Sequence, residues 1–148
     1  MCHTIAMGAG KRFLARVSAG DDPAAASLAA LAAAEDFASE AALDARGGAR
    51  LAVVVEELVS NAIRHGAQGG AIAIDLTLTA DDGEIAVIMI DDGVAFDPTV
   101  DRNFSGPDAE TGGGVGLALV KAWANAFAYT RENGRNLIAL RLRLFGAR

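Results

Sequence analysis

The clearest hydrophobic pattern in the chain lies between residues 51 and 66. Three polar residues there, Glu57, Asn61 and Arg64, follow one another at intervals of four and three, so they should line one flank of a helix. Glu56 should point elsewhere, because neighbouring helical residues diverge by about 100°. The apolar residues recur at the spacing of a core-facing stripe: Leu51, Val54, Val55, Leu58 and Ala62. The pattern predicts an amphipathic helix that ends near Gly66, and its polar line is equally compatible with an ordinary solvated edge.

Two further helices are predicted, one before and one after this central helix. Asp21-Asp22-Pro23 is typical of a helix start, because Asp caps free amides and Pro fits the first turn. The alanine-rich stretch that follows should continue to about Leu43, with Arg46-Gly47-Gly48 as the break before the central helix. The last predicted helix covers residues 117–124 and follows a run of glycines.

The remaining patterned segments read as strands. The stretch at 85–90 is apolar on both faces, which is typical of a central strand. The other predicted strands are 11–17, 71–79, 129–131 and 137–144. We expect residues 1–10 to be a tail and residues 11–148 to be one domain. Its predicted fold is an α+β two-layer sandwich, with a mixed, mainly antiparallel sheet and the helices on one face.

Composition narrows the function classes. The chain has 148 residues, of which 52% are hydrophobic, so one domain with a substantial core is expected. The net charge of −6 without a Lys/Arg stripe argues against direct nucleic-acid binding. No apolar run approaches the roughly 20 residues needed to span a membrane, and the start lacks a signal-peptide layout. A single cysteine, Cys2, fits a reducing cytoplasm.

The glycine run at 112–116 is a candidate phosphate site. It lacks the Gly-Lys-Ser/Thr ending of a Walker A loop and does not fit the dinucleotide fingerprint. What remains is a glycine run that opens a helix, where free backbone amides and the helix dipole attract phosphate. The alternative is a flexible hinge. The polar segment 99–111 just before it has no periodicity, and a loop of that length is usually functional or disordered.

Asp91-Asp92-Gly93 is the second candidate site. A carboxylate at the end of a buried strand can accept a hydrogen bond from an exocyclic amine, and glycine lets the backbone approach a flat ring. The alternative is an ordinary Asp-Gly turn after a strand. Neither this motif nor the glycine run is specific alone.

Their order along the chain is more specific. A helix with Glu57 and Asn61 comes first, then Asp91-x-Gly93 after a strand, and then a polar loop and a glycine run. That run reads Gly112-x-Gly114-x-Gly116-Leu117. This arrangement resembles the GHKL superfamily of ATP-binding domains from about Lys11 onward. Within it, His65-Gly66, Phe96-Asp97-Pro98 and Arg131…Gly134-x-Asn136 are similar to the anti-sigma-factor serine kinase branch.

The resemblance implies a Bergerat-type ATP-binding fold and a role for each matching residue. Glu57 would be the general base, and Asn61 would give its side-chain oxygen to Mg²⁺. Asp91 would read the adenine amine, with Gly93 under the ring. The residues implied to bind the phosphates are Arg64, Gly112, Gly114, Gly116 and Leu117. The role of His65 stays open between a phosphate contact and a helix-end residue. Ala95 stands where the family usually has a second glycine, which puts nucleotide affinity in question.

The function implied is that of an ATP-dependent serine/threonine-protein kinase of the anti-sigma-factor type. Such a protein phosphorylates an anti-anti-sigma-like antagonist and sequesters a sigma factor, which would make it a cytoplasmic regulator of transcription. The resemblance also allows for a homodimer. Two alternatives stand beside it. One is a module that uses ATP only to dock a partner, and the other is a histidine-kinase catalytic domain detached from its phosphoacceptor.

Overall fold

The computed structural model describes residues 1–7, 10–81, 83–100 and 115–143. Its six strands form one sheet in the order β1-β2-β3-β4-β6-β5, and every neighbouring pair is antiparallel. The strands are β1 (Cys2–Met7), β2 (Gly10–Val17), β3 (Ile72–Asp81), β4 (Glu84–Asp91), β5 (Ala124–Glu132) and β6 (Arg135–Arg143). The helical elements are α1 (Pro23–Glu40), α2 (Ala45–Asn61), the π-helical turn η1 (Ala62–Ala67) and α3 (Val115–Trp123).

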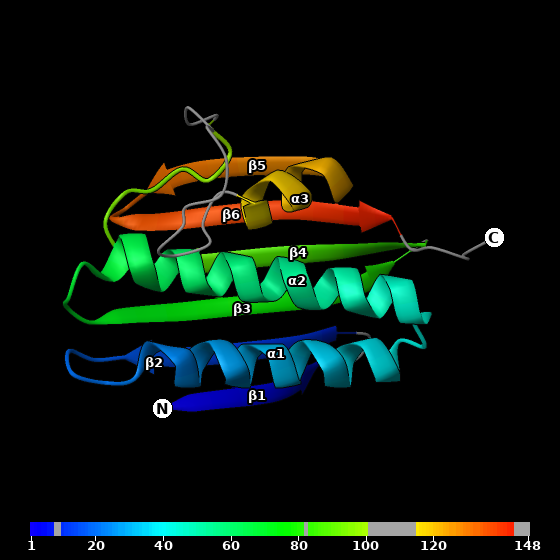
Figure 1. The fold of residues 1–148 in the computed structure, drawn as a ribbon, viewed down its shortest axis with the longest axis horizontal. Coiled ribbons are helices and arrows are strands. Elements are labelled where there is room, and N and C mark those ends of the chain that lie inside the picture. Colours follow the sequence, from blue (N-terminus) through cyan, green and yellow to red (C-terminus); the bar gives the residue numbers. More distant parts are fainter. Residues whose placement is uncertain (8–9, 82, 101–114, 144–148) are drawn as a thin grey trace.

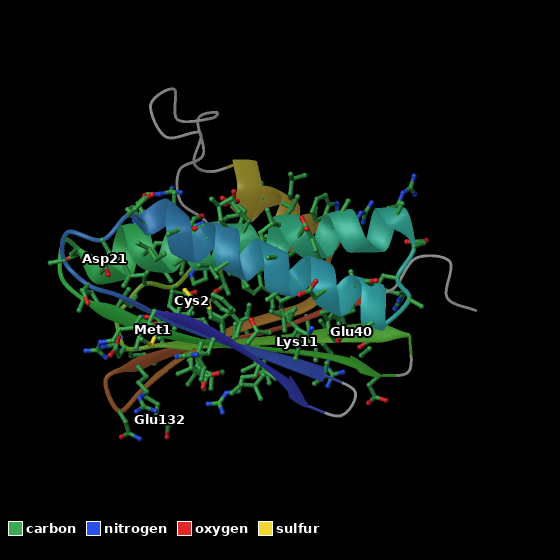
Figure 2. The ribbon with its side chains drawn as sticks, turned by 90° about the horizontal axis from the view of Figure 1, so that it is seen from below. Met1, Cys2, Lys11, Asp21, Glu40 and Glu132 are labelled. Carbon is green, nitrogen blue, oxygen red and sulfur yellow. The ribbon has the colours of Figure 1, made fainter. Side chains whose placement is uncertain are left out.

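The sheet and the helices form two layers. The long helices α1 and α2 run side by side across one face of the sheet, and α3 lies beside α2 over the β5–β6 side (Figures 1 and 2). The predicted α+β sandwich with a mainly antiparallel sheet is therefore confirmed. Both central strands bury alternate residues against the helices, and Leu76 of β3 and Val87 of β4 are completely enclosed.

The N-terminal residues differ from the prediction of a tail. Residues 2–7 form the edge strand β1, which pairs antiparallel with β2 from Cys2↔Ala15 to Met7↔Gly10. Residues 2–5 are all exposed, so the strand rests on backbone hydrogen bonds and leaves no buried stripe in the sequence. The sequence therefore shows no alternation of apolar and polar residues that would predict this strand. In the sheet, β1 pairs with β2 along one edge only.

The two long helices begin at aspartate caps. Asp22 Oδ1 accepts a hydrogen bond from the amide of Ala24 at 3.0 Å, as its position before Pro23 predicted. Asp44 Oδ1 accepts one from the amide of Gly47 at 2.7 Å, so α2 starts before the two glycines that were expected to break the chain. Capping by Asp44 outweighs the weak helix propensity of the pair. The predicted break is thus wrong by a few residues.

The predicted phase of the central helix is confirmed. Leu51, Val54, Val55 and Leu58 are at most 1% exposed and pack into the core.

No helix within the described residues is both long enough and apolar enough to cross a membrane.

Candidate functional site

Glu57 and Asn61 face each other on the flank of α2, as their spacing predicted. The amide nitrogen of Asn61 donates to the Glu57 backbone carbonyl at 2.7 Å and to Glu57 Oε2 at 3.1 Å. Asn61 is buried, and Glu57 is half-buried. Both described bonds use the nitrogen of Asn61. Its side-chain carbonyl oxygen can therefore accept a hydrogen bond or bind a cation.

The start of α3 lies directly against the Glu57 carboxylate. A Cβ placed on Gly116 would come within 1.8 Å of Glu57 Cδ and within 2.2 Å of both carboxylate oxygens. Only a residue without a side chain lets the helix approach this closely while Glu57 keeps its place. The structure thus brings Glu57 and the end of the glycine run together. Leu117 follows in the first turn of α3 and is half-buried, whereas Gly112 and Gly114 lie outside the described residues.

The surroundings of Glu57 raise its pKa above the ordinary glutamate value. Burial is the main cause, and the negative charge of Glu56 adds to it. The hydrogen bond from Asn61 and the positive charge of Arg64 act in the opposite direction. A carboxylate with a raised pKa is a stronger base, which suits proton abstraction.

Asp91 ends β4 and is almost completely buried. Its Oδ1 accepts hydrogen bonds from the Gly93 amide at 2.9 Å and from Asn136 Nδ2 at 2.9 Å. The described hydrogen bonds to this side chain end on Oδ1, so Oδ2 is left for a donor from a ligand. Burial raises the pKa of Asp91, while the bonds from Asn136 and Gly93 oppose the rise.

A contact between two glycines joins α2 to the end of β4. A Cβ on Gly93 would lie 2.8 Å from the Cα of Gly66 and 2.8 Å from Ile72 Cδ1. The amide of Val94 also donates to the Gly66 carbonyl at 2.9 Å. Gly66 was predicted to end the helix. The helical segment ends at Ala67, one residue later, and Gln68 follows it in the left-handed conformation. Close backbone approach explains the glycine at position 66.

The joined elements place Asn61 and Asp91 around one space. Both residues line a cavity of about 10 Å³ between α2, η1 and the strands β4 and β6. Beside it, the imidazole of His65 stacks on the ring of Phe96, with centroids 4.3 Å apart and planes 11° from parallel. This stacking assigns His65 a packing contact with the segment after β4.

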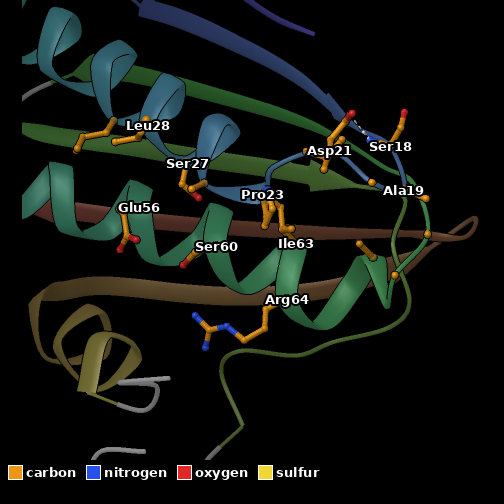
Figure 3. Close-up of a pocket in the computed structure, with 17 residues that line it drawn as sticks. Ser18, Ala19, Asp21, Pro23, Ser27, Leu28, Glu56, Ser60, Ile63 and Arg64 are labelled. Atoms are coloured by element: carbon orange, nitrogen blue, oxygen red, sulfur yellow. Dashed lines mark hydrogen bonds between the residues drawn. The ribbon is translucent and has the colours of Figure 1, made fainter. Parts of the chain in front are cut away.

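Arg64, whose positive charge acts on Glu57, lines a larger groove. The groove has a volume of about 640 Å³ and runs between the first half of α1 and the last turns of α2 (Figure 3). Glu56, Ser60 and Arg64 line it from α2 and η1, and Ser27 and Leu28 line it from α1. Glu56 thus points away from Glu57, as the helical phase predicted.

Three site residues were not assigned roles from the sequence: Asn136, Tyr129 and Arg131. The β5–β6 hairpin carries all three, and β6 places Asn136 opposite Asp91 in the sheet. The only signal in the sequence was the Arg131…Gly134-x-Asn136 pattern, which indicated the family branch without a function.

The residues present fit a magnesium ion held together with nucleotide phosphates. Mg²⁺ prefers oxygen ligands and usually keeps several waters, with one or two protein groups and phosphates completing the shell. The carbonyl oxygen of Asn61 is a group of this chemical kind. Within the described ranges, no group of three or more His, Cys, Asp or Glu residues could form a metal site of the protein's own.

Comparison with protein families shows which family the chain belongs to. The model of the histidine kinase-like ATPase domain matches residues 21–142. The chain belongs to this family, and its membership supports ATP as the ligand.

A curated relative is similar to part of the chain. The serine/threonine-protein kinase BtrW of Bordetella bronchiseptica is 32% identical over 96 residues, which are 61% of this chain and 66% of BtrW. The match thus spans just under two thirds of the relative's length.

Replacement of Gly93 by alanine should destabilise the protein by about 1–3 kcal/mol, the usual cost of overpacking. The new methyl group would meet the backbone of Gly66, which cannot rotate away. Urea unfolding measures the loss. The control is Gly48→Ala in α2, where the methyl group would lie an ordinary 3.6 Å from Ala38 Cβ. Equal stability of Gly93→Ala and the wild type would refute the close contact.

The free energy of unfolding of Glu57→Gln, measured relative to the wild type, should increase as pH rises. Because the folded-state pKa of Glu57 is raised, the folded protein holds this proton more tightly than the unfolded chain. The wild type therefore loses stability from the ordinary glutamate pKa up to the raised value, and the glutamine variant does not. Urea unfolding from pH 4 to pH 8 tests this, with the exposed Glu35→Gln as control. A stability difference that stays constant with pH would contradict the assignment.

Proposed function

We propose that this protein is a serine/threonine-protein kinase that transfers the γ-phosphoryl group of ATP to a protein antagonist. The carrying observation is the Glu57 carboxylate, held by the amide of Asn61 and set against Gly116 at the start of α3. A domain that only binds nucleotide has no need of a base at this position. The BtrW name and the family support the same activity.

In this proposal ATP lies between α2, the end of β4 and the start of α3. Asp91 accepts a hydrogen bond from the adenine amine through Oδ2, while its Oδ1 is held by the protein. The first amides of α3 and the guanidinium of Arg64 offer positive charge to the phosphates. When bound, Mg²⁺ neutralises phosphate charge, and Asn61 would hold it through its carbonyl oxygen.

Glu57 acts on the acceptor. Its carboxylate takes the proton from the serine hydroxyl as the oxygen forms a bond to the γ-phosphorus. The bond from that phosphorus to the bridging oxygen breaks, and ADP leaves. Phosphoryl transfer depends mainly on positioning and charge neutralisation. The raised pKa of Glu57 favours the proton transfer, because the base is matched more closely to neutral pH.

The partners belong to the same proposal. By resemblance to the anti-sigma-factor kinase branch, the acceptor is an anti-anti-sigma-like protein and the second partner is a sigma factor. We place this activity in the cytoplasm, with no direct contact to nucleic acid, and the resemblance allows for a homodimer.

Glu57→Gln should separate transfer from binding. The variant keeps the size of the side chain and its place in the helix, so ATP·Mg²⁺ affinity and partner capture should stay near wild type. Loss of the base should slow phosphorylation of the antagonist by about 10²–10⁴-fold. The assay is phosphate incorporation into co-expressed candidate antagonists, measured beside nucleotide affinity.

The exposed Glu35→Gln in α1 is the matched control and should change neither quantity. If wild-type protein binds ATP tightly but phosphorylates no candidate, the reading of a nucleotide-dependent binding module replaces the kinase. If Glu57→Gln transfers phosphate as fast as the wild type, Glu57 is not the base.

A further inference from the structure

Asn136 is the most fully hydrogen-bonded side chain in the described part of the site. It is 2% exposed and lies opposite Asp91 in the β4–β6 register. Its amide nitrogen donates to Asp91 Oδ1 at 2.9 Å and to the carbonyl of Val94 at 2.9 Å. Its carbonyl oxygen accepts from Tyr129 Oη at 2.6 Å, Arg131 Nη1 at 3.1 Å and the amide of Phe96 at 3.4 Å.

These contacts fix which way the amide of Asn136 faces. A reversed amide would turn its oxygen toward Asp91 Oδ1, so that two acceptors would meet. Arg131 prevents this, because a guanidinium can only donate and therefore requires the oxygen on its own side. Arg131 also donates to the carbonyl of Gly93 at 2.7 Å, which ties it to the same segment.

The hydrogen bonds of Asn136 reach Asp91 and the segment after it, which would face the adenine of a bound nucleotide. One end holds Asp91, and the other bonds hold the segment from Gly93 to Phe96 that follows it. With the amides of Asn136 and Gly93 both on Oδ1, the carboxylate cannot rotate freely and presents Oδ2 in one direction. The bond from Asn136 also favours the ionised form of Asp91 and so works against the rise in pKa caused by burial.

We propose that Asn136, oriented by Arg131 and Tyr129, is a positioning residue that holds Asp91 as the acceptor for the amine of a bound base. The proposal rests on the proposed function, in which Asp91 reads adenine. It makes the β5–β6 hairpin part of the nucleotide site, although the hairpin supplies no group that touches the base.

Asn136→Asp tests the proposal, because it keeps the shape and replaces the donor by a carboxylate. Two carboxylates at this distance cannot both be ionised easily, so the pair should share one proton over a raised pH range. While the pair shares a proton, the carboxyl group at position 136 can still donate a hydrogen bond to Asp91. When it is lost at higher pH, the two groups repel each other. ATP affinity of the variant should therefore be about tenfold below wild type at pH 8 and recover toward pH 6.

The charged and titratable groups around this pair are the same in both proteins. They are Asp92 beside Asp91, Arg131 and Tyr129 on β5, and His65 on η1, which stacks on Phe96. A wild-type titration over the same pH range therefore corrects for them and for protonation of ATP itself. A residue that served only the stability of the fold would not add this pH dependence to binding.

Arg131→Met and Tyr129→Phe provide a second route if Asn136→Asp does not fold. Each removes one donor to the carbonyl oxygen of Asn136, and each should raise the KM for ATP several-fold while kcat at saturating ATP stays near wild type. Arg135→Met is the matched control on the same hairpin, because Arg135 is exposed and pairs with Glu132 in the hairpin register.

The outcomes separate the two proposals. Binding of ATP that depends on pH more steeply in Asn136→Asp than in the wild type supports the role of Asn136. Equal ATP affinity of wild type and all three variants at both pH values overturns this inference and leaves the kinase proposal standing. A wild-type protein that binds no ATP by calorimetry overturns the proposed function and this inference with it.

Discussion

The site depends on the close approach of two glycines, Gly66 in η1 and Gly93 after β4. Their backbones pack within the space that a single methyl group would need, and the Val94 amide closes the contact with a hydrogen bond to the Gly66 carbonyl. This contact holds η1, at the end of the central helix, against the end of β4. Because of it, Asn61 and Asp91 line the same cavity, although they are 30 positions apart in the sequence.

A second close approach completes the arrangement. Gly116 allows the start of α3 to lie against the Glu57 carboxylate, one helical turn before Asn61. The central helical segment thus contacts the end of β4 through Gly66 and the start of α3 through Glu57. Both contacts require the absence of a side chain, so glycine acts here through packing as well as through backbone freedom. Burial is the main cause of the raised pKa values of Glu57 and Asp91.

The local patterns were sufficient to predict the central helix. The apolar stripe fixed its phase, and the spacing of Glu57 and Asn61 then placed both side chains on one flank, where they bond to each other. The position of Asp91 at a strand end was also evident, since a strand that is apolar on both faces ends there. Periodicity and turn chemistry act over a few residues, and these features need nothing more.

Features that depend on distant contacts could not be predicted. Gly66 was correctly placed near the end of the helix, but its contact with Gly93 was not evident, because the two glycines are remote in sequence. Edge strand β1 has exposed side chains and leaves no hydrophobic pattern. The hydrogen bond from Asn136 to Asp91 joins residues 45 positions apart and requires the register of β4 with β6. Such registers are set by the whole sheet, so the hairpin's part in the site emerged only from the structure.

Calorimetric titration of ATP·Mg²⁺ into Asp91→Asn and Glu57→Gln tests the central claim most directly. The claim is that Asp91 binds the base, whereas Glu57 acts on the acceptor. Asparagine lacks the charge of Asp91 and can turn a competing donor toward the amine, so its ATP affinity should fall by about tenfold to a hundredfold. Glu57→Gln should bind as the wild type does. Identical titration curves for the two variants would contradict this division of roles.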